Sequence, residues 1–297
     1  MKKLLLGPVV LFVSLAPVFA QYTFTSLDYP GGTVTTTRGI NNHGEIVGGY
    51  RITGPRHALL IKGGQYIPID PTSILGTNYS EAFKNNDHGD VVGQYIGSDG
   101  FIHGFLLRKG VLTTLDFPTA SDTYAYGINE SGTVVGGWDI LDSSGNALVE
   151  HGFTWNKGNF TQVDFPGAAD TAVLGINARG DLVGGWDAGI TSPVGHGFVF
   201  TKGQYVNLDV PVAGATITSP NDINAQGAIV GYYFDAGGNF HGFLMEGAKF
   251  TSIDYPGAAE TSAWGINSAG QIVGIHFDTV NSPRRGYIAQ PGKKGKP

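Results

Sequence analysis

The sequence predicts an all-β protein, a six-bladed β-propeller of four-stranded blades whose ring is closed by the N-terminal strand. The main observation is a segment, Gly-Ile-Asn-x-x-Gly-x-(Ile/Val/Leu)-Val-Gly, that recurs at intervals of 45, 43, 48, 47 and 43 residues. A fixed period of this length is typical of repeat architectures, propellers among them. The composition agrees, since 47 of 297 residues are glycine and only 14% are charged. The last glycines of the six copies are Gly48, Gly93, Gly136, Gly184, Gly231 and Gly274.

Residues 1–20 are expected to be a secretory signal peptide rather than part of the fold. Lys2 and Lys3 precede an apolar run, and Val18-Phe19-Ala20 is a small-residue cleavage pattern. This apolar run is too short for a spanning helix, and the sequence has no other long apolar run. The sequence therefore predicts a chain that is cut after Ala20 and works outside the cell or in a periplasm.

The fourth copy shows why each period should form four short strands. Residues 160–164 alternate and end at a Pro-Gly pair, which cannot continue a ladder. Residues 171–177 and 181–186 form the next two strands around an Asn-x-x-Gly turn, and 196–200 form the last, ended by Lys-Gly. We expect the turn glycines Gly132, Gly180 and Gly270 to have positive φ.

The order of these strands at the two chain ends predicts how the ring closes. Residues 22–30 form an Asp-aromatic-Pro strand with no blade before it, and the last copy ends at 285–290 without such a strand. Pairing the two would complete the sixth blade and remove an exposed edge. The predicted propeller is residues 21–290, followed by a disordered basic tail, 291–297.

The copies resemble the HAF family of extracellular repeats, which is named for its His-Ala-Phe tripeptide. The resemblance lies in the Gly-Ile-Asn-x-x-Gly-x-Val-Val-Gly motif followed by tripeptides such as His57-Ala58-Leu59 and His103-Gly104-Phe105, and it covers residues 22–290. The turn motif of the second copy departs from the pattern, with Lys84-Asn85-Asn86. The resemblance implies secretion and a repeat fold, and it implies no catalytic residue.

Charge and cysteine content exclude several classes of protein. The chain has no cysteine, so packing and strand pairing must hold it together. The formal charge is −6, and loss of the two signal lysines leaves −8. Because no basic stripe runs through the repeats, nucleic acid is not expected as a partner.

Polar side chains recur at fixed places in the copies, and their role has two possible interpretations. One is a ring of ligands around the channel, for example for a metal. The favoured one is a set of structural hydrogen bonds within blades, because a site is usually unique whereas a structural device repeats. The sets include a hydroxyl before the Gly-Ile-Asn segment, the turn Asn, and the structural positions Asp28, Asp116, Asp164, Asp254, His103, His151, His196 and His241.

Aromatic residues recur two positions after the third-strand glycine, and here both interpretations stay open. They either pack between blades, which is favoured, or form an aromatic wall that binds a sugar or peptide. The loops that follow them, 139–149, 187–194 and 278–283, differ most between copies and should gather on one face, often the binding face. The candidate ligand-binding residues are Tyr50, Tyr95, Trp138, Trp186 and Tyr233.

These patterns indicate a secreted, non-catalytic binding scaffold for an extracellular glycan or surface protein. The alternatives are an extracellular polysaccharide hydrolase or lyase and a structural envelope protein. A hydrolase needs two suitably spaced carboxylates, and Glu81, Glu150 and Glu260 are the glutamates that break the repeat. No catalytic residue, metal ligand or cofactor is predicted. Calcium is conceivable only at the aspartates after the aromatic positions, such as Asp139 and Asp187.

Overall fold

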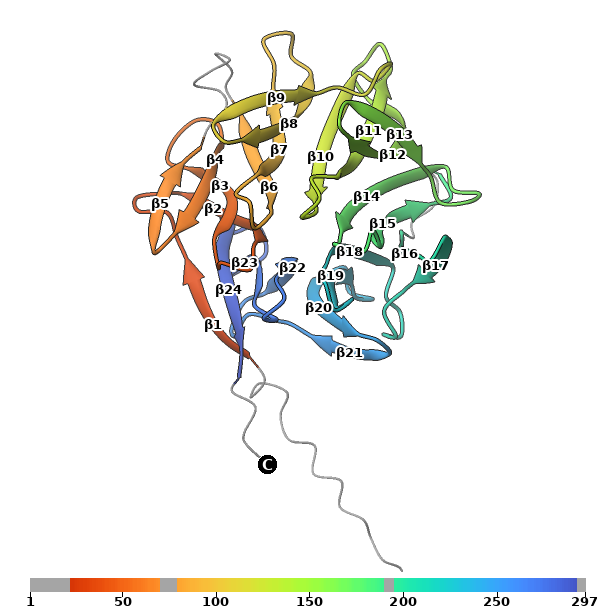
Figure 1. Ribbon diagram of the computed structural model, residues 1–297. Coiled ribbons are helices and arrows are strands. Elements are labelled where there is room, and N and C mark those ends of the chain that lie inside the picture. Colours follow the sequence, from red (N-terminus) through yellow and green to blue (C-terminus); the bar gives the residue numbers. More distant parts are fainter. Residues whose placement is uncertain (1–21, 70–78, 190–194, 293–297) are drawn as a thin grey trace, which may run out of the picture.

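The computed structural model describes residues 22–69, 79–189 and 195–292, and the predicted signal peptide and residues 293–297 lie outside these ranges. Within them the chain forms 24 strands and no helix. Six antiparallel sheets of four strands stand around a central axis (Figure 1). The predicted six-bladed β-propeller is confirmed.

Blades I to V are meanders in which the strand nearest the axis comes first in the chain, and in blade VI the outermost strand is β1 from the N-terminal end. The bounds are as follows. Blade I holds β2 (Val34–Ile40), β3 (Ile46–Arg51), β4 (His57–Lys62) and β5 (Gln65–Pro68); blade II holds β6 (Ser80–Asn85), β7 (Val91–Ile96), β8 (Ile102–Arg108) and β9 (Val111–Leu115); blade III holds β10 (Asp122–Ile128), β11 (Val134–Leu141), β12 (Ala147–Asn156) and β13 (Asn159–Val163). Blade IV holds β14 (Asp170–Ile176), β15 (Leu182–Asp187), β16 (His196–Thr201) and β17 (Gln204–Leu208); blade V holds β18 (Ile217–Ile223), β19 (Ile229–Phe234), β20 (Phe240–Glu246) and β21 (Lys249–Ser252); blade VI holds β22 (Glu260–Ile266), β23 (Ile272–Phe277), β24 (Arg285–Pro291) and β1 (Tyr22–Leu27).

Blade VI joins the two ends of the chain, as the strand order predicts. β1 pairs antiparallel with β24 over six residue pairs, from Tyr22 with Pro291 to Leu27 with Gly286 (Figure 1). Pro291 is thus the end of a strand and not the start of the predicted tail. Arg285 stands where the other copies carry the tripeptide His, and its Nη1 lies 3.0 Å from Oδ2 of Asp28 on the closing segment.

Every blade carries a β-bulge between its two innermost strands. In blade III the register shifts between Ala125 and Gly127, so Tyr126 is the extra residue. A bulge re-aims one side chain and twists the strand. Opposite it lies the last glycine of the repeat motif: a Cβ on Gly136 would be 1.8 Å from the Tyr124 carbonyl oxygen, so no larger residue fits.

The predicted turn geometry is confirmed, because Gly132, Gly180 and Gly270 have φ of 79°, 82° and 77°. The core of each blade centres on the third residue of the tripeptide, which is fully buried. These core residues are Leu59, Phe105, Phe153, Phe198, Phe243 and Tyr287.

Repeated polar residues tie strands together inside blades. The tripeptide His bonds through Nδ1 to the Asp that ends the outer strand: His103 to Asp116 at 2.8 Å is one example. The corresponding pairs are His151–Asp164, His196–Asp209 and His241–Asp254. The repeated hydroxyl accepts a backbone N–H from the crossover segment, as Thr123 does from Phe117 at 3.0 Å. Asp70, the corresponding residue for His57, lies outside the described residues.

The recurring aromatics lie on the second strand of each blade and pack between consecutive blades. Where the crossover segment reads Asp-aromatic-Pro, its aromatic stacks on this ring in the next blade: Phe117 lies 4.3 Å from Trp138, and Tyr29 lies 3.9 Å from Tyr50. The second-strand ring also contacts the tripeptide His, as Trp138 contacts His151 at 4.8 Å. For these rings the stacking partner is therefore the crossover ring rather than a glycine.

Candidate functional site at the loop end of the channel

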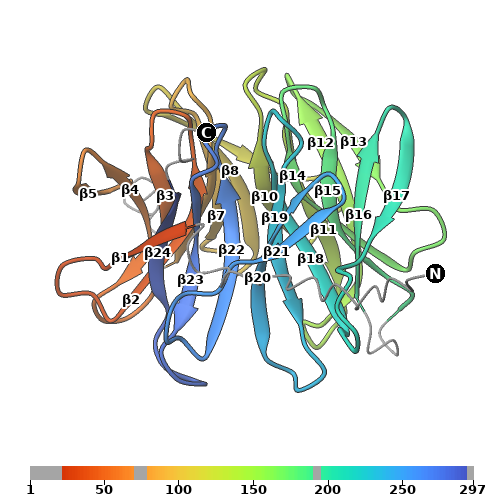
Figure 2. The ribbon, with the colours of Figure 1, turned by 90° about the horizontal axis from the view of Figure 1, so that it is seen from below.

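The central channel has two chemically different ends. All innermost strands run in the same direction along the axis, so the Asn-x-x-Gly turns meet at one end, which we call the turn end. The loops between the second and third strands of each blade, and the crossovers between blades, meet at the other, which we call the loop end. Figure 2 shows the strands of the blades running between these two sets of connections.

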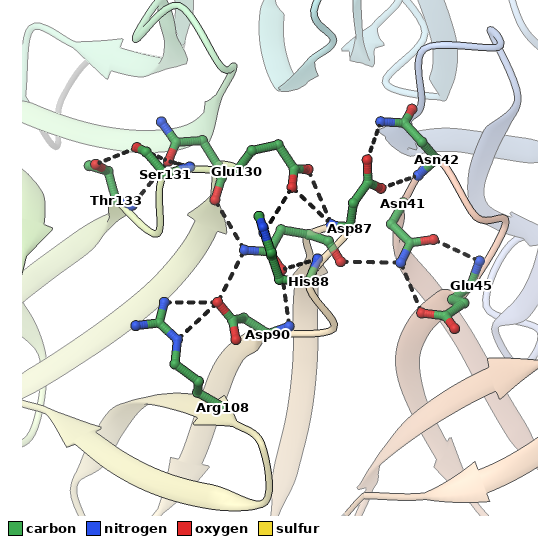
Figure 3. A network of polar contacts seen from close by, with 12 residues as sticks. Asn41, Asn42, Glu45, Asp87, His88, Asp90, Arg108, Glu130, Ser131 and Thr133 are labelled. Atoms are coloured by element: carbon green, nitrogen blue, oxygen red, sulfur yellow. Dashed lines mark hydrogen bonds and ion pairs between the residues drawn. The ribbon is translucent and has the colours of Figure 1, made fainter.

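The turn end is closed by a ring of asparagine hydrogen bonds between blades. Each turn Asn donates its Nδ2 to the backbone carbonyl of the corresponding Asn in the next blade, at 3.1–3.3 Å, and Figure 3 shows the part around Asn41. The ring runs Asn41, Asn86, Asn129, Asn177, Asn224, Asn267 and back to Asn41. The repeat pattern predicts that the repeated polar residues form hydrogen bonds within blades. The side-chain amide of each turn Asn instead donates to a carbonyl of the neighbouring blade.

The middle of the channel is filled by side chains and forms a floor. The six bulge residues point inward there, and a cavity of only about 20 Å³ remains among them. Directly beside this layer, Lys84 Nζ of blade II reaches Asp222 Oδ2 of blade V at 2.7 Å. The bulge residues are Arg38, Phe83, Tyr126, Leu174, Asn221 and Trp264.

On the loop side of this floor lies a depression that we call the cup. Around it lie residues that change from blade to blade, although their neighbours repeat. Positions two residues apart along a strand share one face of the sheet, which brings these positions near one another. One set follows the repeated hydroxyl: Thr36, Glu81, Tyr124, Ala172, Ser219 and Ser262. A second precedes the tripeptide: Arg56, Ile102, Glu150, Gly195, Phe240 and Arg284.

One part of the cup wall is an arginine cluster around a buried carboxylate. Glu81, which is 2% exposed, accepts hydrogen bonds from Arg38 Nε at 3.0 Å, from Thr36 Oγ1 at 2.8 Å and from Arg56 Nη1. Burial raises the pKa of Glu81, but Arg38 and Arg56 outweigh it and lower the pKa to about 2. This carboxylate is therefore ionised at any physiological pH. Arg284 completes the cluster, and partial burial together with Arg56 and Arg38 lowers its pKa.

Next to the arginines is an aromatic cavity of about 150 Å³. Tyr232, Phe234 and Phe240 come from blade V, and Trp264 and Phe277 from blade VI. Arg38 and Arg284 also line it, and the Arg38 guanidinium lies 3.8 Å from the Trp264 ring centroid, a cation–π contact. The cavity therefore combines flat apolar walls with positive charge.

The opposite part of the cup is acidic. A second cavity, of about 280 Å³, is lined by Glu150, Asp170 and Asp187 and meets the first at Tyr232, which borders both. Beside it Asp139 is paired in register with Glu150, and its Oδ2 lies 3.3 Å from the hydroxyl of Tyr124. Ligands in the cup would thus meet arginines on one side and carboxyl groups on the other.

Crowding and burial hold two of these carboxyl groups partly protonated. Burial, with help from Asp122, raises the pKa of Asp139 to about 6. Burial, with help from Asp139, Asp170 and Asp187, raises the pKa of Glu150 to about 7. Asp139 Oδ1 is buried and has no hydrogen-bond partner among the described residues. These are proton-holding groups near neutral pH, unlike Glu81.

We expect folding stability to fall as pH rises through this range. The pKa of Glu150 rises from 4.5 to about 7 on folding, so between those values the native state binds more protons than the unfolded chain. Stability is then present below pH ~4.5 and lost toward pH 7, by about 2 to 3 kcal/mol. Denaturant unfolding at pH 5 and pH 7.5 should show this loss, and Glu150→Gln should remove most of it.

The exposed Glu246, changed to Gln, is the control and should leave the slope as in the parent. A parent and a Glu150→Gln variant with the same pH dependence would contradict the assignment of Glu150. The carboxylate of Glu81 acts in the opposite sense, since its stabilisation is lost only as pH falls below ~4.5 toward 2.

The five candidate ligand-binding aromatics predicted from the sequence lie one residue away from the cup-facing positions. Tyr95, Trp138 and Tyr233 are at most 7% exposed, and their ring centroids lie 4.8–5.3 Å from those of His103, His151 and His241. Tyr50 and Trp186 stack on crossover rings, and Trp186 also borders the acidic cavity. These contacts favour packing for the five residues. The repeat pattern does not point to Tyr126, Tyr232 or Trp264, which line the cavities.

Of the three glutamates that break the repeat, the structure brings two to the cup, Glu81 and Glu150. Glu260 begins β22 and borders neither cavity. Across residues 22–69, 79–189 and 195–292, no three His, Asp or Glu side chains are grouped so that they could hold a metal ion. In the same ranges no helix is long and apolar enough to cross a bilayer.

The comparisons with known proteins place this chain by its fold. No protein-family model and no curated protein matches it. Among solved structures, a Dyadobacter fermentans protein of unknown function is similar at a TM-score of 0.58 and 8% identity, covering 91% of this chain and 98% of that one. The β-propeller domain of the Trilobed protease from Pyrococcus furiosus, with an open velcro topology, is similar at 0.50 and 9%, covering 89% and 100%.

The six-bladed fucose-binding lectin of Aleuria aurantia is similar at a TM-score of 0.46 and 11% identity, covering 92% of this chain and 99% of the lectin. Identities this low show the propeller fold and nothing more about function. The binding properties of this chain therefore depend on the side chains of its own cup.

Proposed function

We propose that this protein is a secreted binding propeller whose cup takes an extracellular glycan. The observation that carries the proposal is that the residues which depart from the repeat converge on the cup. Repeated residues are accounted for by packing and strand pairing, whereas the cup contains aromatic, charged and hydroxyl groups that the fold does not require.

The shape of the cup favours a glycan over a flat protein surface. The two cavities, of about 150 and 280 Å³, are concave and share Tyr232 as a lining residue. Aromatic rings offer flat apolar faces on which a pyranose can lie, and hydrogen-bonding groups beside them can meet its hydroxyls. Outer loops, where the sequence placed the binding face, then form the rim rather than the centre.

The test is a glycan array probed with the mature chain, residues 21–297. We expect retention on a defined subset of glycans, lost by at least about tenfold in Phe277→Ala because this ring lines the aromatic cavity. Phe101→Ala is the matched control, since Phe101 is a 41% exposed aromatic on the same side of the propeller and does not line the cavity. Equal melting temperatures exclude a folding defect. A parent chain that binds no glycan contradicts the proposal.

A second candidate, a glycan hydrolase, is favoured by one specific observation. Asp139 and Glu150 are paired in register on neighbouring strands, and burial raises the pKa of each carboxyl group, to about 6 and about 7. Glycosidases use such a pair of carboxyl groups as acid and base or nucleophile. Release of reducing ends from a bound glycan, lost in Glu150→Gln, supports hydrolysis; binding without release supports the scaffold.

A further inference from the structure

We propose that the arginine side of the cup recognises a carboxylate carried on a sugar ring, that is, a uronic acid or another acidic sugar. This proposal rests on glycan binding by the cup and names its ligand class. The arginine cluster has an excess of positive charge. Three guanidinium groups, those of Arg38, Arg56 and Arg284, surround a single ionised carboxylate, Glu81. Two positive charges are therefore left without a counter-charge in the cluster.

Two of these arginines also have unused hydrogen-bonding capacity. Arg38 is 8% exposed, and its Nη1 is buried without a partner among the described residues. The Arg284 side chain makes no hydrogen bond or ion pair with any described residue, yet it lines the aromatic cavity together with Arg38. A buried charged donor without a partner is costly, and native structures rarely keep one without a role. An anion in the cavity would pair with the Arg284 guanidinium beside Arg38.

The surroundings favour a carboxylate over a sulfate or phosphate ester. Guanidinium groups present donors in a planar fork that matches the two oxygens of a carboxylate. A tetrahedral anion needs donors on more sides, and the remaining lining is mostly apolar: Phe234, Phe240, Ile275 and Phe277, beside Tyr232, Trp264 and Ser262. Those rings suit the apolar face of the sugar that carries the carboxylate.

The acidic side of the cup determines the orientation of the bound glycan and limits the number of negative charges that the glycan can carry. Glu150, Asp170 and Asp187 line the cavity that adjoins the arginine side at Tyr232. Carboxyl groups accept hydrogen bonds from sugar hydroxyls but repel further anions. The cup therefore suits one acidic residue at the arginine side, followed by a neutral sugar, and not a densely charged polyanion.

Isothermal titration calorimetry with three matched trisaccharides tests this proposal: one ending in glucuronic acid, one in glucose and one in 6-sulfated glucose. We expect the glucuronic acid form to bind the mature chain at least about tenfold tighter than the glucose form. In Arg284→Gln that preference should disappear, because the glucuronic acid form should lose more affinity than the glucose form. Arg284→Lys, which keeps the charge but loses the fork, should fall between.

Arg285→Gln is the matched control, because Arg285 is the next residue, pairs with Asp28 and Asp278, and does not line the cavity. Equal binding of the acidic and neutral trisaccharides, or a preference for the sulfated one, overturns carboxylate recognition but leaves glycan binding in place. If none of the three binds and the array is also blank, both proposals fail. A preference that Arg284→Gln leaves intact overturns the assignment of the arginine cluster.

Discussion

Lys84→Met is expected to lower the free energy of unfolding by about 3 to 5 kcal/mol. The Lys84 ammonium lies 2.7 Å from Asp222 Oδ2 and 2.7 Å from the carbonyl oxygen of Trp264, so one side chain connects blades II, V and VI across the axis. Both Lys84 and Asp222 are at most 8% exposed. Removing the cation leaves the Asp222 carboxylate buried without its counter-ion, which costs far more than the lost contact.

A double-mutant cycle separates the ion pair from the loss of packing. Denaturant unfolding of Lys84→Met, Asp222→Asn and the double variant should give a double-variant loss smaller than the sum by at least about 1.5 kcal/mol, because neither residue then remains as a lone buried charge. Asn keeps an oxygen that can accept the Ile266 N–H, which Asp222 accepts at 2.9 Å. Additive losses would show that the two residues do not interact across the channel.

This ion pair also shows how far sequence reasoning reached. Lys84 and Asp222 stand where the other four copies have the glycine of Gly-Ile-Asn. That glycine is needed where innermost strands approach closely: a Cβ on Gly39 would lie 2.8 Å from the Lys84 Cα. Of these two departures, only the one at Lys84 enters the prediction from sequence. Two departures of opposite charge, three blades apart in a six-bladed ring, predict a contact across the axis.

The fold was predictable because it rests on features that repeat. These features are the turn glycines, the Asn-x-x-Gly spacing and the order of strands at the chain ends. Each follows from a local backbone requirement, and the six copies repeat the evidence. The direction of the Asn amide was not predictable in this way. Whether Asn41 bonds within its blade or reaches the Asn86 carbonyl depends on the distance between blades, which no single copy encodes.

The candidate site was missed for the reverse reason. Tyr50 and its counterparts recur, so the repeat pattern points to them, and in the structure their rings stack on neighbouring rings. The cup-facing residues sit one position away, as Trp138 adjoins Gly137, whose register partner is Tyr124. Because strand side chains alternate, a shift of one residue changes the face. The signal that could have found the cup is variation at a fixed repeat position, since the fold leaves those positions free.

Closure by the N-terminal strand gives the second large expected effect: a chain that starts at Gly32 should melt at least 10 °C lower than one that starts at Gln21. The lost segment includes β1, with six residue pairs to β24, and Phe24, whose ring lies 5.6 Å from those of Tyr255 and Tyr287. Truncating a packed Phe alone costs about 3 to 5 kcal/mol, and in a domain of this size each 1 kcal/mol lowers Tm by about 2 to 4 °C.

The truncation also leaves β24 as an open edge with unpaired backbone groups, so the shortened chain should self-associate at high concentration. Differential scanning calorimetry and light scattering measure the two effects. A chain ending at Gly292 is the control, because it shortens the opposite end without removing a described strand. Phe24→Ala adds a version with the backbone intact and should account for part of the loss. If the chain starting at Gly32 melts like the parent, the pairing of β1 with β24 does not hold the ring shut, and blade VI is stable with three strands.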